Sequence, residues 1–154
     1  MTYQKTSAGM IRWLFLGFVA GFLATLIFHQ LTLCVLWAVG FAPFKPFSMA
    51  LTKPFGVPAV ISLAFWGGLW GSVFVLITGR LLKHGVYWIV AFLFGAILPT
   101  AVALLIVLPL KGHPMGGGWR LPLLITAFLV NGAWGVGTGL ALKVFTGPSA
   151  LPRK

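Results

Sequence analysis

The most unusual polar residues of this chain are His29 and Gln30, which adjoin each other inside a long apolar run. An imidazole and an amide in such a run need hydrogen-bond partners or water, because an unsatisfied polar group in hydrocarbon costs several kcal/mol. Two interpretations of His29 stay open. It contacts a ligand, a proton or a cofactor, for example as an axial ligand to a haem or chlorin. Alternatively, it is a neutral, hydrogen-bonded histidine that fixes helix packing.

A second intramembrane polar group is Asn131, eleven residues past Arg120 and therefore close to the middle of a membrane-spanning helix. Its amide can bond across to Thr100, to Thr126 or to an exposed carbonyl near Pro99. The alternative to such structural bonding is a polar binding pocket next to Trp134. The candidate intramembrane polar site is thus a set of five residues: His29, Gln30, Thr100, Asn131 and Trp134.

Most enzyme chemistry is excluded by composition. The 154 residues include 11 Lys and Arg but no Asp or Glu, which rules out paired-carboxylate hydrolysis and disfavours hard-cation sites and acid-dependent proton coupling. Ser62 and Ser72 have no neighbouring base or orienting acid. His113 and Met115 form at most a weak Cu(I) pair. We therefore predict no catalytic residue, no metal site, no resident cofactor and no enzyme activity.

Glycines spaced four apart give the clearest physical signal. Residues four apart stack on one helix face, so two glycines let another backbone approach closely. The pairs are Gly17 and Gly21, Gly67 and Gly71, and Gly135 and Gly139. Two interpretations stay open: the pairs pack the helices of this chain together, or they form a docking face for another subunit or a second copy.

The elements that carry these residues are membrane helices. Hydrophobic residues make up 60% of the chain and charged residues 7%, which suits lipid and could not cover a surface in water. Four continuously apolar runs each exceed the roughly 20 residues that a spanning helix needs. The first is too long for a signal peptide and is interpreted as a retained helix. The predicted fold is all-α, one transmembrane domain over residues 1–154, with helices at about 11–42, 59–82, 86–110 and 121–145.

A faint internal repeat suggests that the four-helix bundle consists of two tandem helical hairpins. Two such copies would be related by an axis along the membrane normal. The matching residues are Gly68–Gly71 with Gly132–Gly135, and Phe18 and Gly21 with Phe92 and Gly95.

The connection at 41–58 mixes prolines, phenylalanines and lysines. This composition favours an ordinary connection near the headgroups over a short, half-inserted cap on the bundle.

Basic residues between the apolar runs predict the orientation and the partners. Seven lie on the side of the termini and four on the other, which favours cytoplasmic termini. The seven are Lys5, Arg12, Arg80, Lys83, Lys143, Arg153 and Lys154, and the four are Lys45, Lys53, Lys111 and Arg120. They can meet anionic headgroups or an acidic partner. No polar domain presents a nucleic-acid surface.

The stretches Gly17–Gln30, Pro54–Gly71 and Asn131–Gly139 resemble uncharacterised bacterial inner-membrane proteins of about this length, a resemblance that carries no function. We predict a non-enzymatic structural or accessory subunit of the bacterial inner membrane, packing against another membrane protein or itself. The alternative is a small channel or carrier for an anion or neutral solute, with a polar track past Asn131, Thr100 and His29.

Overall fold

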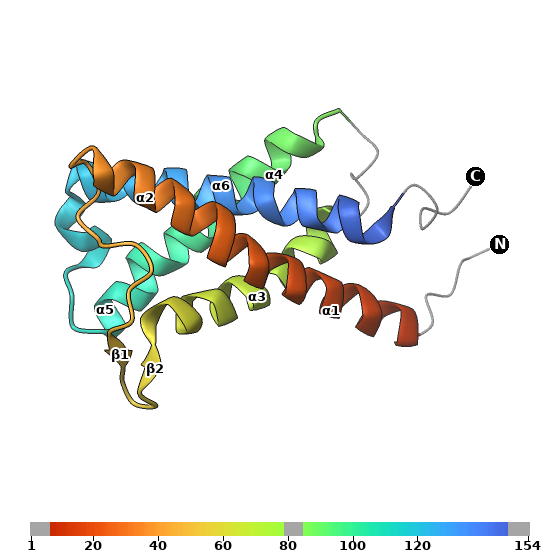
Figure 1. Ribbon diagram of the computed structural model, residues 1–154, viewed down its shortest axis with the longest axis horizontal. Helices are drawn as coiled ribbons and strands as arrows, with labels where there is room; N and C mark the ends of the chain where they lie inside the picture. The colour runs from red at the N-terminus through yellow and green to blue at the C-terminus, as the bar shows by residue number, and fades with distance from the viewer. Residues whose placement is uncertain (1–6, 79–84, 148–154) are drawn as a thin grey trace.

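The computed structural model describes residues 7–78 and 85–147. In this part of the chain, four helices are long and apolar enough to cross a membrane, which confirms the predicted all-α four-helix fold. Figure 1 shows that α1 begins and α6 ends at the same end of the bundle. We call this end the terminal end, and the opposite end, which carries residues 39–58 and 111–120, the loop end.

The first span is one continuous helix with a wide turn in it. Its parts are α1 (Ser7–Ala24), the π-helical turn η1 (Thr25–His29) and α2 (Gln30–Ala38). A π turn holds an extra residue and rotates everything that follows it. In an uninterrupted α-helix, Leu31 would lie on the same face as the buried Ala20 and Ala24. Leu31 is instead 55% exposed, while His29 and Gln30 are buried. The turn therefore brings these two polar residues into the bundle.

The first connection folds back against the helix that it leaves. The helix ends at Ala38, four residues before the predicted end, because Gly40 adopts a φ of +72°. The N–H groups of Phe41 and Ala42 both donate to the Leu36 carbonyl, and the Phe47 N–H donates to the Gln30 side chain at 2.6 Å. The bond to Gln30 thus draws Phe47 back alongside the helix, although most of residues 39–50 are exposed. Whether this segment is an ordinary connection or a half-inserted cap stays a prediction.

A small β-hairpin then leads into the second span. Strands β1 (Leu51–Thr52) and β2 (Val57–Pro58) pair antiparallel, and Figure 1 shows the hairpin projecting from the loop end. Helix α3 (Ala59–Thr78) follows at once. Its predicted end at Leu82 lies outside the described residues.

The second half of the chain repeats this plan with a shorter connection. Its elements are α4 (Tyr87–Val102), the π-helical turn η2 (Ala103–Val107), α5 (Leu108–Leu110), the 3₁₀ turn η3 (Met115–Trp119) and α6 (Leu121–Thr146). The helix continues through Pro99, and the π turn begins four residues later. The residues from Gly116 to Trp119 all have positive φ. This left-handed turn depends on its glycines, because only glycine adopts such angles at little cost.

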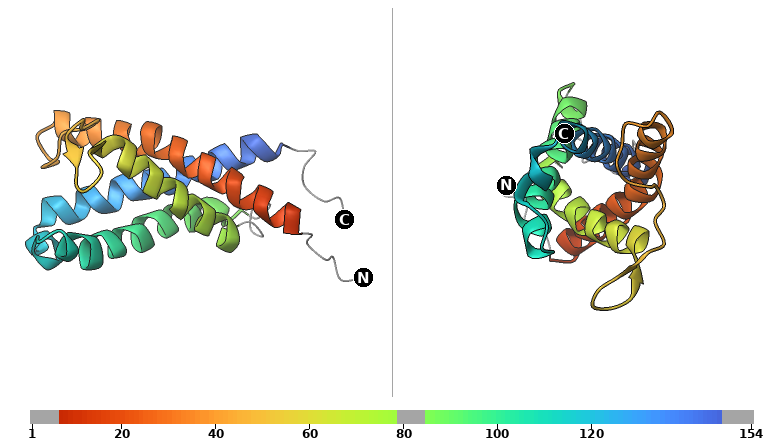
Figure 2. Two further views of the ribbon diagram at one scale, coloured as in Figure 1. Left: turned by 90° about the horizontal axis from the view of Figure 1, so that it is seen from below. Right: turned by 90° about the vertical axis from the view of Figure 1, so that its left-hand side faces the viewer.

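Aromatic rings fill the centre of the bundle, and the right-hand view of Figure 2 shows this bundle end-on. Phe74 meets Phe94 edge-on at 5.1 Å between ring centroids, and Trp134 lies 6.4 Å from both. All three side chains are buried. The Trp134 indole N–H donates to the Gly21 carbonyl at 2.9 Å, so this cluster joins the two halves of the chain by packing and by a hydrogen bond.

Candidate functional site

The first glycine contact joins α1 to α3. Gly17 lies against the backbone of Gly71, and Gly21 lies against the backbone of Gly67. A Cβ at any of these four positions would overlap atoms of the opposite helix. Close approach of the two backbones therefore requires glycine at all four positions.

The second glycine contact joins α4 to α6 in the same way. Gly95 lies against the Asn131 carbonyl, and Gly135 lies against the Ala91 carbonyl. One turn further along, Gly139 leaves room for Tyr87, whose hydroxyl donates to the Gly139 carbonyl at 3.2 Å. Each of the predicted packing glycines thus meets another helix of this chain.

The two contacts match residue for residue. Each α1 residue corresponds to the α4 residue 74 positions later, and each α3 residue to the α6 residue 64 positions later. The contact of Gly17 with Gly71 thus corresponds to that of Ala91 with Gly135. The aromatic neighbours follow the same rule, since Phe18 packs on Gly68 and Phe92 packs on Gly132. The helices therefore form two equivalent pairs, which we call the first helix pair (α1–α3) and the second helix pair (α4–α6).

His29 and Gln30 support the first connection. The Gln30 amide lies 3.4 Å from Nδ1 of His29, and its oxygen accepts the Phe47 N–H. Both side chains are buried, to 8% and 2% exposure. The Gln30 amide thus bridges His29 and Phe47 of the first connection.

Thr100 and Asn131 form a separate polar pair between α4 and α6. The Asn131 amide donates to Oγ1 of Thr100 at 3.0 Å, and that hydroxyl donates to the Ala127 carbonyl at 3.2 Å. Trp134 follows Asn131 on the same helix but turns to Gly21 of α1. The five predicted polar residues are therefore divided among three places: the first connection, the contact of α4 with α6, and the aromatic centre.

One further polar residue, Thr126, is expected from the sequence only as an alternative partner of Asn131, which bonds to Thr100 instead. Its hydroxyl is buried and is the one such side-chain atom, within residues 7–78 and 85–147, that has no hydrogen-bond partner. Four other buried threonines donate to the carbonyl four residues earlier, namely Thr25, Thr78, Thr138 and Thr146. The missing partner of Thr126 is thus an exception within this chain.

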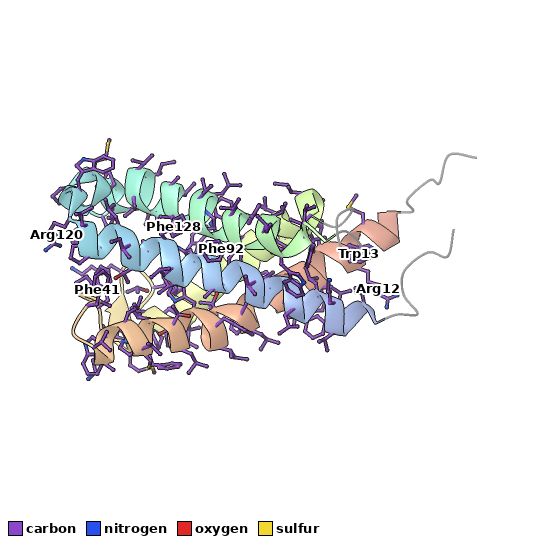
Figure 3. All side chains as sticks on the ribbon, turned by 90° about the horizontal axis from the view of Figure 1, so that it is seen from above. Arg12, Trp13, Phe41, Phe92, Arg120 and Phe128 are labelled. Carbon is purple, nitrogen blue, oxygen red and sulfur yellow. The ribbon has the colours of Figure 1, made fainter. Side chains whose placement is uncertain are left out.

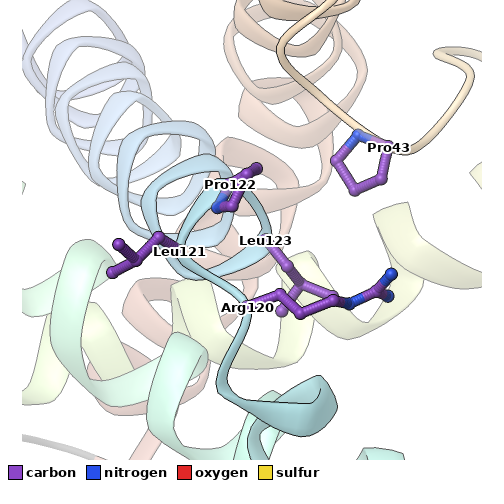
Figure 4. A pocket seen from close by; sticks show the side chains of 5 residues that line it. All are labelled: Pro43, Arg120, Leu121, Pro122 and Leu123. Atoms are coloured by element: carbon purple, nitrogen blue, oxygen red, sulfur yellow. The ribbon is translucent and has the colours of Figure 1, made fainter.

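A cavity of about 520 Å³ opens at the loop end. Figure 4 shows its lining residues, which are Pro43, Arg120, Leu121, Pro122 and Leu123. Pro43 belongs to the connection that folds back, and the other four are the N-cap and the first three residues of α6. The walls are apolar apart from the exposed Arg120, whose Nε donates to the Gly117 carbonyl at 3.4 Å.

No cluster of metal ligands occurs in the described ranges, where no three of His, Cys, Asp or Glu gather. His113 and Met115 are both exposed. The chain matches no protein-family model, no curated protein and no solved structure.

Proposed function

We propose that this chain is a non-enzymatic membrane subunit, which packs against another membrane protein or a second copy of itself. The observation that carries the proposal is the position of Trp66. This side chain is 59% exposed on the outer face of α3, well inside the membrane-spanning length of that helix.

The depth of Trp66 is counted from the first residue of α3. The 20 described residues of this helix already rise about 30 Å, which equals the usual hydrocarbon thickness. Trp66 comes seven residues after Ala59 and therefore lies about 10 Å inside. Tryptophan prefers the headgroup level, where its indole N–H finds acceptors. No acceptor for this N–H is found among the described residues, so a partner that covers Trp66 would supply one.

A row of aromatic rings holds Trp66 in place. Phe65 meets the Trp66 ring at 6.1 Å and the Phe18 ring at 5.8 Å, both edge-on, and Phe18 stacks on Phe22 at 6.3 Å. Rigid aromatic side chains lose little conformational entropy on association and are enriched in protein interfaces. This row forms a preorganised surface on the first helix pair.

The unbalanced charge supports a partner too. Figure 3 places Arg12 at the terminal end and Arg120 at the loop end, and the whole sequence has 11 basic residues and no acidic one. Acidic groups of a partner protein or anionic lipid headgroups would neutralise these ends. The excess of basic residues on the side of the termini supports a bacterial inner-membrane location with cytoplasmic termini.

Packing of the interior favours a subunit over a channel or carrier. A solute path past His29, Thr100 and Asn131 would need polar groups that connect these residues. The rings of Phe74, Phe94 and Trp134 instead occupy the centre of the bundle, and Thr100 and Asn131 bond to each other.

The test is the mass of the full-length protein purified from its native membranes in mild detergent. One chain has a mass of 16.6 kDa. We expect native mass spectrometry to find a stoichiometric, heavier complex that Trp66→Leu disrupts. The matched control is Phe128→Leu, because Phe128 is 39% exposed and pairs with Phe92 on the second helix pair.

Two outcomes would count against the proposal. A single chain in every preparation contradicts the subunit function. Equal loss of the complex in both variants shows a loss of folding, and the Trp66 surface is then not the contact.

A further inference from the structure

We infer that the cavity at the loop end is a binding site for one anionic phospholipid. Its walls suit the acyl chains next to the headgroup, and Arg120 suits the phosphate. This inference goes beyond the proposed function and does not depend on Trp66.

The first argument is the location and lining of the cavity. It lies where α6 begins, at the level where hydrocarbon gives way to headgroups, and four of its five lining residues are apolar. A volume of about 520 Å³ falls in the range of small-molecule sites. Its opening and its apolar walls fit a segment of lipid better than a small hydrated ion.

The second argument is charge. Arg120 is the charged residue of the lining, and Figure 4 shows its side chain extending beneath Pro43. Its Nε is directed to Gly117, so the two terminal nitrogens remain for a phosphate, whose oxygens guanidinium binds in a bidentate manner. The other basic residues of this end, Lys45, Lys53 and Lys111, are exposed, and no acidic residue in the sequence competes for them.

The third argument is the unpartnered Thr126 hydroxyl. On α6, Thr126 lies one turn past Leu123, which lines the cavity, and one turn before Val130, which packs with Ala42 next to Pro43. Its hydroxyl does not bond to the carbonyl of Pro122, another lining residue. A buried hydroxyl without a partner is destabilising. The Thr126 oxygen is closed off from the surface and does not line the cavity, so a water enclosed beneath the bound lipid, and not the lipid itself, would satisfy it.

A phospholipid explains the three observations together. A free phosphate would engage Arg120 but leave the apolar walls uncovered. A zwitterionic lipid would cover the walls, but its own cation would offset the phosphate charge next to Arg120.

The experiment is native mass spectrometry of the full-length protein in detergent, titrated with phosphatidylglycerol or phosphatidylcholine. We expect one phosphatidylglycerol to bind at least about tenfold more tightly than phosphatidylcholine, because both lipids carry a phosphate but the choline cation of phosphatidylcholine offsets that charge beside Arg120. Arg120→Gln should remove most of this preference. Lys111→Gln is the matched control, because it removes a charge from the same end without lining the cavity, and it should change the affinity less than about twofold.

A second variant keeps the inference testable if Arg120→Gln fails to fold, as circular dichroism would reveal. Leu121→Trp keeps the arginine but narrows the cavity, and Leu121 is 68% exposed, so folding should persist while lipid binding falls. Equal affinity for the two lipids, or equal losses in Arg120→Gln and Lys111→Gln, would overturn the inference. Inorganic phosphate that displaces phosphatidylglycerol at equal concentration would identify a free-anion site instead.

Discussion

The two helix pairs use one packing plan with different side chains. Where the first pair has Gly17 opposite Gly71, the second has Ala91 opposite Gly135. The extra methyl group in α4 coincides with a smaller residue in α6, because Val75 of the first pair corresponds to Gly139 of the second. The comparison teaches that the spacing of the helices is kept by exchanging volume across the contact, since membrane helices associate through close packing.

The pairs differ most at one polar position and in their connections. Gly67 of the first pair corresponds to Asn131 of the second, where a side-chain bond to Thr100 is added to the backbone contact. The first connection folds back over residues 39–50 and is tied to Gln30. The second is a short left-handed turn. The contacts between helices are thus repeated while the loop end is not.

The largest expected effect comes from forcing the helices apart. Gly71→Leu and Gly135→Leu should each destabilise the protein by about 3 kcal/mol, because both side chains would enter the opposite backbone. Denaturant titration in detergent measures the loss. Gly85→Leu is the control, since a Cβ there meets nothing within 4 Å. A large loss in one pair and a small loss in the other would break the equivalence of the pairs.

The exchange of volume can be tested directly. Gly17→Ala should cost about 2 kcal/mol, because its Cβ would meet the Gly71 carbonyl and the Val75 side chain. Val75→Ala in the same chain should restore about 1 kcal/mol of this loss in a double-mutant cycle. Strictly additive effects would show that the volumes of the two positions are not coupled.

The tryptophans of the repeat sharpen the comparison further. Trp134→Phe removes the bond to the Gly21 carbonyl and should cost about 1 kcal/mol in the free energy of unfolding. Trp70, its equivalent in the first pair, is half-buried and packs edge-on against Phe94. Trp70→Phe should therefore cost less than half as much. Equal costs would mean that the indole bond adds no stability.

The smallest effect concerns the polar position. Asn131→Ala and Thr100→Val should each cost about 0.6 kcal/mol, the average for hydrogen bonds between membrane helices. The double variant should cost little more than either, because both changes remove one bond. The cycle compares the unfolding free energies of the wild type, the two single variants and the double variant. If the loss in the double variant equals the sum of the two single losses, Asn131 and Thr100 do not interact directly.

Much of the fold follows from patterns of the sequence. Each span is predicted by its continuous apolar run, and Gly17 and Gly21 indicate close approach because residues four apart share a helix face. The repeat at Gly68 and Gly132 already suggests which helices are equivalent. Whether the glycines face inward or toward a partner depends on which helices meet, and a single helix carries no such information.

The candidate site was less predictable. The π turn at Thr25–His29 contains neither proline nor glycine, so no residue marks the rotation that buries Gln30. The bond from Phe47 to Gln30 joins residues 17 positions apart through an irregular segment. Nothing in the sequence distinguishes Thr126 from the other helical threonines. That its hydroxyl lacks a hydrogen-bond partner is seen only in the folded structure.

The unequal length of the first and third spans has a consequence for the surrounding lipid. The apolar helix Gly9–Ala38 has 30 residues and rises about 45 Å, whereas Tyr87–Leu110 has 24 residues and rises about 36 Å. This difference is a hydrophobic mismatch within one molecule. A bilayer of uniform thickness matches both helices only if the longer one tilts. The tilt of the protein relative to the bilayer normal should therefore depend on membrane thickness, so lipids with longer or shorter acyl chains should change the tilt angle.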